Sequence, residues 1–76
     1  MRAMLKLVSK QKIAKGEWEG KLLLNGTIEL TFYKFKDGWG SGLTVYFNDA
    51  VVGDEVESVD GVAGWDIVDA AIDVIE

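Results

Sequence analysis

An Asn-Gly pair between two alternating stretches of apolar and polar residues constrains this chain more than any other feature. Asn25 and Gly26 both tolerate the positive φ of a type I′ turn, and such a pair between apolar runs is a strong signal of a β-hairpin. Residues 17–24 and 27–36 each alternate with a period of two. Their predicted core faces carry Trp18, Gly20, Leu22 and Leu24 in the first run, and Ile28, Leu30 and Phe32 in the second.

Two shorter runs are predicted to extend this hairpin into a sheet. Residues 3–8 alternate with Ala3, Leu5 and Leu7 on one face, and residues 43–47 alternate with Leu43, Val45 and Phe47 on one face. Residues 9–16 are expected to form a lysine-rich connection, and residues 37–42 a flexible glycine-rich connection. A short edge strand is predicted at residues 56–59.

Residues 65–76 have the periodicity of an amphipathic helix. At about 100° per residue, one half of the helical wheel is apolar, and it holds Trp65, Ile67, Val68, Ala71, Ile72, Val74 and Ile75. This helix is expected to pack on the sheet, because an apolar face must be buried against another element. The predicted fold is α+β, a small antiparallel sheet of about four strands packed by one C-terminal amphipathic helix, and residues 1–76 form a single domain.

The residue types that are missing exclude several classes of function. The chain has no Cys and no His, so it lacks disulfides, the usual transition-metal ligands and the commonest catalytic base and nucleophile. We therefore expect no metal site, no cofactor and no enzymatic activity. No apolar run approaches the roughly 18 residues of a membrane-spanning helix, so we expect no membrane partner and a cytoplasmic location.

The charges are unevenly distributed along the sequence. Residues 1–47 carry eight basic and four acidic side chains, a net charge of +4, whereas residues 48–76 carry nine acidic side chains and no basic one. A basic sheet could neutralise the acidic segment within the molecule, and a net charge away from zero also favours solubility. The third explanation is an acidic surface that steers binding to a basic partner. The sequence leaves these explanations open.

The candidate partner-binding residues are mostly acidic. The predicted helix directs four carboxylates away from the sheet, two of them in its last turn, where negative charge opposes the helix dipole. This local conflict favours an acidic surface kept for binding. The candidates are Asp66, Asp69, Asp73 and Glu76 on the helix, Asp54, Glu55 and Glu57 in the preceding loop, and Trp39.

Aromatic residues allow a second kind of site. Tyr33, Phe35 and Tyr46 are predicted on the sheet face opposite the core, near Lys34 and Lys36. Small β-domains stack single-stranded bases on such a face, but the favoured interpretation is that the helix or another subunit covers it. Trp39 can anchor a partner or fold over the sheet edge and cap the core, and the capping role is favoured. Trp18 and Trp65 are predicted core residues.

Three functions are consistent with these patterns. The favoured hypothesis is a small acidic inhibitor that docks on the basic, nucleic-acid-binding surface of a partner protein, because carboxylates about 5.4 Å apart along a helix imitate a phosphate backbone. Inhibitors of this size and charge are encoded by phages and other mobile elements. The alternatives are a single-stranded nucleic-acid-binding domain, which a pI near 4.5 disfavours, and a homo-oligomeric structural subunit that assembles through the aromatic face or an exposed edge strand.

Overall fold

The computed structural model describes residues 4–76 and contains two sheets and one helix. The larger sheet is an antiparallel meander in the order β1-β2-β3-β4-β5, and the smaller pairs β6 with β7. The elements are β1 (Leu5–Ala14), β2 (Glu17–Leu24), β3 (Ile28–Lys36), β4 (Ser41–Phe47), β5 (Ala50–Val51), β6 (Ser58–Val59), β7 (Val62–Ala63) and α1 (Gly64–Ile75). The α+β prediction is therefore confirmed. Ala3, the predicted start of the first strand, lies outside the described residues.

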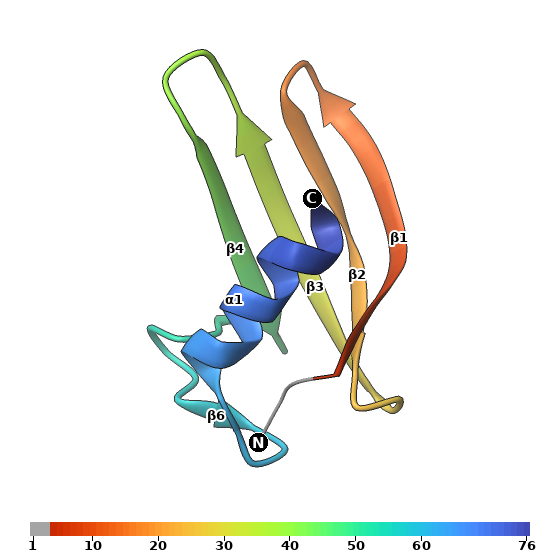
Figure 1. Ribbon diagram of the computed structural model, residues 1–76, viewed down its shortest axis with the longest axis vertical. Coiled ribbons are helices and arrows are strands. Elements are labelled where there is room, and N and C mark those ends of the chain that lie inside the picture. Colours follow the sequence, from red (N-terminus) through yellow and green to blue (C-terminus); the bar gives the residue numbers. More distant parts are fainter. Residues whose placement is uncertain (1–3) are drawn as a thin grey trace.

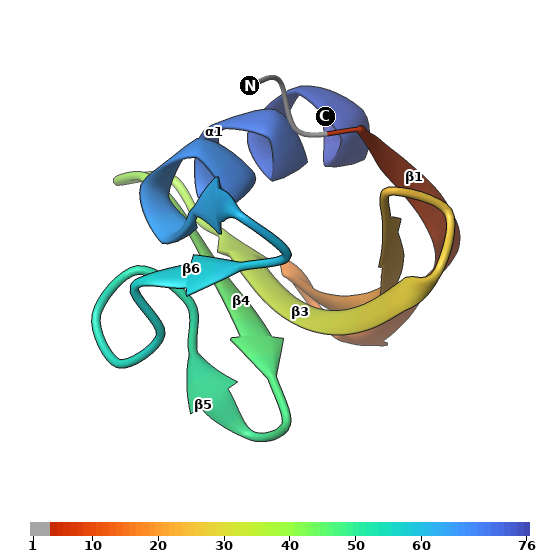
Figure 2. The same ribbon diagram turned by 90° about the horizontal axis from the view of Figure 1, so that it is seen from below.

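The sheet curls around the helix. Figure 2 shows β1 to β4 as a strongly bent layer, with α1 lying across its concave side. The apolar side of each element faces this space, and the core contains Leu22, Leu24, Leu30, Phe32, Val45, Val52, Val59, Val62, Ile67, Ala71 and Ile75. In Figure 1 the β1–β2 and β3–β4 hairpins extend beyond the C-terminal end of α1, so part of the concave face is not covered by the helix.

The Asn25–Gly26 turn has the backbone that the sequence predicts. The φ angles of Asn25 and Gly26 are 52° and 81°. The amide of Thr27 donates a hydrogen bond to the carbonyl of Leu24 at 3.2 Å, and Leu24 pairs with Ile28, so the loop between the strands has one residue more than a two-residue hairpin. Positive φ angles at consecutive residues recur in two further hairpin turns, at 48–49 and 60–61, which carry no Asn-Gly pair.

The first strand is longer than predicted. Residues 9–14 continue β1 and pair with β2, so the interpretation of this segment as a connection is wrong. A register shift between Leu7 and Ser9 changes which residues face the concave side. This bulge breaks the period of two, and it brings Lys10 and Lys12 to the concave face although Lys6 lies on the other. A second shift follows between Lys12 and Ala14.

Two aromatic rings cover glycines on neighbouring strands. Gly20 pairs with Phe32, and a Cβ placed on Gly20 would lie 2.8 Å from atoms of the Phe32 ring. On the opposite face Gly42 pairs with Phe35, whose ring fills the space that a side chain at Gly42 would need. Each ring thus replaces the missing side chain of its partner, an arrangement that compensates for glycine in a strand.

The segment between β5 and α1 forms a compact loop at residues 52–57, which we call the acidic loop, and a small hairpin. The predicted strand at residues 56–59 is present only at Ser58–Val59, which pairs with Val62–Ala63 apart from the main sheet. Val56 instead forms an isolated parallel bridge to Val52. The glycine-rich connection is also shorter than predicted, since β4 begins at Ser41.

Candidate functional site

The helix has one buried face and one exposed face that combines acidic and apolar side chains. Ile67, Ala71 and Ile75 are buried in the core between the helix and the sheet, and Gly64 is buried at the start of the helix against Gly53 and Val56. The exposed face carries Trp65, Asp66, Asp69, Ile72, Asp73 and Glu76. Positions three and four residues apart are neighbours on a helix, so Trp65, Asp69 and Ile72 form one continuous stripe. The predicted outward direction is therefore observed for Asp66, Asp69 and Asp73, with two apolar side chains among them, whereas the carboxylate of Glu76 turns back to Lys34 of the sheet.

The sequence predicted Trp65 as a core residue. This prediction is wrong, because Trp65 is 59% exposed. The cause is the close approach of the helix start to the acidic loop. A Cβ on Gly64 would lie 2.6 Å from the carbonyl oxygen of Val56 and 2.7 Å from the amide nitrogen of Gly53, so no indole fits between them. The helix is therefore rotated, and Trp65 lies outside. The same rotation leaves Ile72 43% exposed, although it was predicted in the apolar half of the wheel.

The acidic loop lies against the start of the helix. The Trp65 ring rests on Gly53, since a Cβ built there would be 3.1 Å from ring atoms, and the amide of Gly64 donates to the carbonyl of Glu57 at 2.7 Å. Glu55 holds the loop, because its Oε1 accepts a 2.9 Å hydrogen bond from the amide of Val51. We call the exposed helix residues and this loop together the acidic face; it comprises Asp54, Glu55, Glu57, Trp65, Asp66, Asp69, Ile72 and Asp73.

Glu76 is engaged within the molecule. Its carboxylate forms a salt bridge with Lys34, whose side chain is buried on the concave face. The hydrogen bond and the charge of Lys34 lower the pKa of Glu76, and Lys36 and Lys10 lower it further. Nζ of Lys10 donates to the carbonyl of Ile75 at 3.3 Å. Cations from the sheet thus compensate the acidic C-terminal turn, so the conflict with the helix dipole does not by itself indicate a partner.

Trp39 lies far from the acidic face. It is 99% exposed in the tight turn between β3 and β4, so the prediction that it caps the core is wrong. Oδ1 of Asp37 fixes this turn by accepting hydrogen bonds from the amides of Trp39 and Gly40 at 2.8 and 2.9 Å. Figure 1 shows the β3–β4 turn at the end of the molecule opposite to the acidic loop. Trp39 and the acidic loop therefore cannot belong to the same partner-binding patch.

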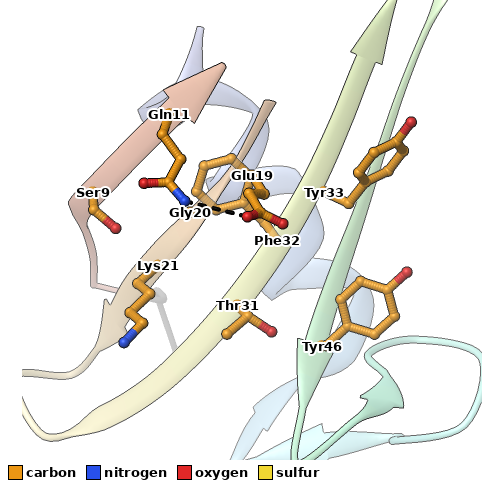
Figure 3. A pocket seen from close by; sticks show the side chains of 9 residues that line it. All are labelled: Ser9, Gln11, Glu19, Gly20, Lys21, Thr31, Phe32, Tyr33 and Tyr46. Carbon is orange, nitrogen blue, oxygen red and sulfur yellow. Dashed lines mark hydrogen bonds between the residues drawn. The ribbon is translucent and has the colours of Figure 1, made fainter. Parts of the chain in front are cut away.

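The aromatic outer face of the sheet does not carry the buried lysine of β3. Tyr33 and Tyr46 lie side by side along a depression of about 640 Å³ (Figure 3). The hydroxyl of Tyr33 donates a 2.6 Å hydrogen bond to Glu17, which raises the pKa of Tyr33. Lys34 and Lys36 alternate with Tyr33 along β3 and lie on the concave face. The predicted grouping of Lys34 with the tyrosines is therefore wrong, whereas Lys36, at the end of β3, also borders a depression with Tyr33 and Phe35.

Among residues 4–76, no group of three or more Asp or Glu side chains is arranged to hold a metal ion. No helix in the same residues is long and apolar enough to cross a membrane. Neither protein-family models, nor curated proteins, nor solved structures give a significant match to this chain.

Proposed function

We propose that this protein binds a partner protein through the acidic face and occupies a basic, nucleic-acid-binding surface of that partner. The observation that carries the proposal is the combination of exposed Trp65 and Ile72 with carboxylates on the same helix face. Tryptophan is enriched among residues that contribute most to protein interfaces, particularly where surrounding groups exclude water. An acidic surface kept only for solubility has no need of an indole at its centre.

The carboxylates determine the kind of partner. Asp66, Asp69 and Asp73 are three and four residues apart, so successive charges lie about one helical turn, or roughly 5.4 Å, from one another. Asp54 and Glu57 extend the negative charge beyond the helix start. Lysines and arginines that bind phosphates fit this pattern, and opposite charges on the two surfaces accelerate their association. The activity that follows is inhibition by competition with nucleic acid.

The two components of the acidic face have separate tests. Asp69→Lys with Asp73→Lys reverses the charge of the helix without touching its buried side. The matched control is Glu19→Lys with Glu29→Lys, which changes the net charge equally on the outer face of the sheet. Trp65→Ala removes the apolar anchor, and a loss of about 30-fold in affinity is expected if the indole contributes the 2 kcal/mol typical of an interface hot spot.

The measurement is capture of partner proteins from a cell lysate, followed by titration of the purified partner. We expect the wild type and the sheet control to capture the same nucleic-acid-binding protein, the helix double variant to lose it, and duplex DNA to displace the wild type. Circular dichroism and urea unfolding establish that each variant is folded. Equal capture by the helix variant, or a partner whose binding is indifferent to DNA, would refute the proposal.

A further inference from the structure

The concave face beyond the end of the helix carries a second cluster of charged and aromatic side chains. Strand pairing places Lys12, Trp18 and Lys34 in one row, because Lys12 pairs with Trp18 and Trp18 pairs with Lys34. Side chains directly opposite one another on neighbouring strands share a face of the sheet. Lys10 and Lys36 lie two residues from Lys12 and Lys34 along their strands and share that face. We call Lys10, Lys12, Trp18, Lys34 and Lys36 the basic cradle.

The basic cradle has a defined geometry rather than being a set of scattered surface lysines. Lys34 is only 6% exposed, and Nζ of Lys10 lies 5.6 Å from the centroid of the Trp18 ring. A cavity of about 230 Å³ lies among Lys10, Trp18, Lys34, Lys36, Ile75 and Glu76. The β1 bulge is needed for this arrangement, since without the register shift Lys10 and Lys12 would face the other side.

An anion already occupies part of the cradle, and it belongs to the chain itself. The carboxylate of Glu76 forms a salt bridge with Lys34, and the positive charges of Lys10 and Lys36 also stabilise it and lower its pKa. One carboxylate among four lysines leaves an excess of positive charge. Asp73, the nearest member of the acidic face, lies three residues before Glu76 on the exposed side of the helix, and the acidic loop is at the other end of the molecule (Figure 1). The cradle can therefore attract an anion despite the net charge of −5.

We propose that the basic cradle binds single-stranded nucleic acid, with phosphates on the lysines and bases on the tryptophans, and that Glu76 holds the place of a phosphate in the unbound protein. Trp18 lines the cavity, and Trp39 is 99% exposed in the β3–β4 turn, three residues after Lys36. Lysines that follow a backbone together with aromatic rings that stack bases are the usual components of single-strand recognition. An acidic peptide would use the lysines but not the flat faces of two indoles. This inference is independent of docking through the acidic face.

The test uses a fluorescein-labelled oligodeoxythymidine of about 12 nucleotides and the full chain, with binding followed by fluorescence anisotropy at increasing salt. Lys10→Gln with Lys36→Gln is expected to weaken binding at least tenfold and to reduce the slope of log affinity against log salt by about 1.4, the value for two phosphate contacts on a single strand. The matched control is Lys6→Gln with Lys21→Gln, which removes the same charge from outside the cradle. Its affinity is expected to stay within threefold of the wild type.

Two further variants separate the roles of the carboxylate and the indole. Glu76→Gln is expected to bind the oligonucleotide severalfold more tightly, because the competing intramolecular anion is gone. Trp39→Ala is expected to weaken binding about tenfold with an unchanged salt slope, because stacking involves no phosphate. Urea unfolding verifies the fold of every variant. Equal weakening by the cradle variant and the control, no binding at low salt, or equally tight binding of a glutamate peptide of the same charge would each overturn the proposal.

Discussion

Three glycine-to-alanine substitutions separate the two reasons for which this fold requires glycine. At Gly20 the backbone conformation is ordinary, but an added Cβ would overlap the carbonyl oxygen of Ser9 and approach the Phe32 ring to 2.8 Å. At Gly26 the space is open within 4 Å, but φ is +81°. At Gly38 the space is open and φ is not positive, so neither reason applies. The same substitution thus measures a steric effect at Gly20 and a conformational effect at Gly26, and Gly38 is the reference position.

The expected losses of stability follow from these differences. At Gly20 the obstacle is backbone in the β1 bulge, which cannot move without disturbing its ladder, so we expect the upper part of the overpacking range, about 2–3 kcal/mol. Alanine at Gly26 must adopt a left-handed conformation, at a net cost of about 1 kcal/mol. Alanine at Gly38 restricts the unfolded chain, and the expected effect is between zero and a stabilisation of about 0.5 kcal/mol. A chain of 76 residues has about 4–11 kcal/mol in total, so the first change is a large fraction.

The assay is urea unfolding of the three variants and the wild type, followed by tryptophan fluorescence and circular dichroism. With a slope of about 1 kcal/mol per molar urea for so small a protein, the midpoints should fall by about 2–3 M for Gly20→Ala and about 1 M for Gly26→Ala. Gly38→Ala should unfold at or slightly above the wild-type midpoint. If Gly20→Ala unfolds within 0.5 M of the wild type, roughly the scatter of a surface substitution, the packing of Ser9 over Gly20 is wrong.

Further predictions concern the core and two titrating groups. Ile67→Ala removes a side chain that is fully buried between helix and sheet, and calorimetry or urea unfolding should show a loss of about 2–5 kcal/mol. The pKa of Glu76 is lowered on folding, so its pairing with Lys34 stabilises the protein fully above the ordinary glutamate pKa of 4.5. This stabilisation is lost as the pH falls through the lowered pKa. Glu76→Gln should remove this part of the acid dependence of the urea midpoint. The raised pKa of Tyr33 means that its contribution is present below pH 10.0 and is lost as the pH rises through the raised value, and an absorbance titration should show one tyrosine shifting back in Glu17→Gln.

The order of elements was predictable because it depends on local chemistry. The alternation in residues 17–36 and the Asn25–Gly26 pair specify a hairpin without reference to the rest of the chain. The length of β1 was not predictable in the same way, since a bulge removes the period of two that identifies a strand. A strand with lysines on both faces is then indistinguishable from a polar connection by pattern alone.

In the candidate sites, too, features set by the local sequence were predictable and features set by tertiary contacts were not. The outward direction of Asp66, Asp69 and Asp73 follows from helical periodicity, and the structure agrees. The exposure of Trp65 depends on the contact of Gly64 with the acidic loop, which is a tertiary contact between segments that no periodicity relates. The partnership of Lys34 with Glu76 spans 42 positions. Lys34 is two residues from Phe32 on β3, so the strand alternation that placed Phe32 and Trp18 on the core face could also have placed Lys34 there.

The order of strands in the sheet has a kinetic consequence. Each pair of neighbouring strands in the larger sheet is joined by only two to four residues, so closing each hairpin costs little chain entropy. The helix, by contrast, contacts β1 across most of the chain length and β4 across a shorter but still long-range separation. Chains rich in local pairings fold quickly, and contacts that close long loops form late. The hairpins are thus expected to dominate the transition state for folding, while the docking of α1 follows it and governs how slowly the native protein unfolds.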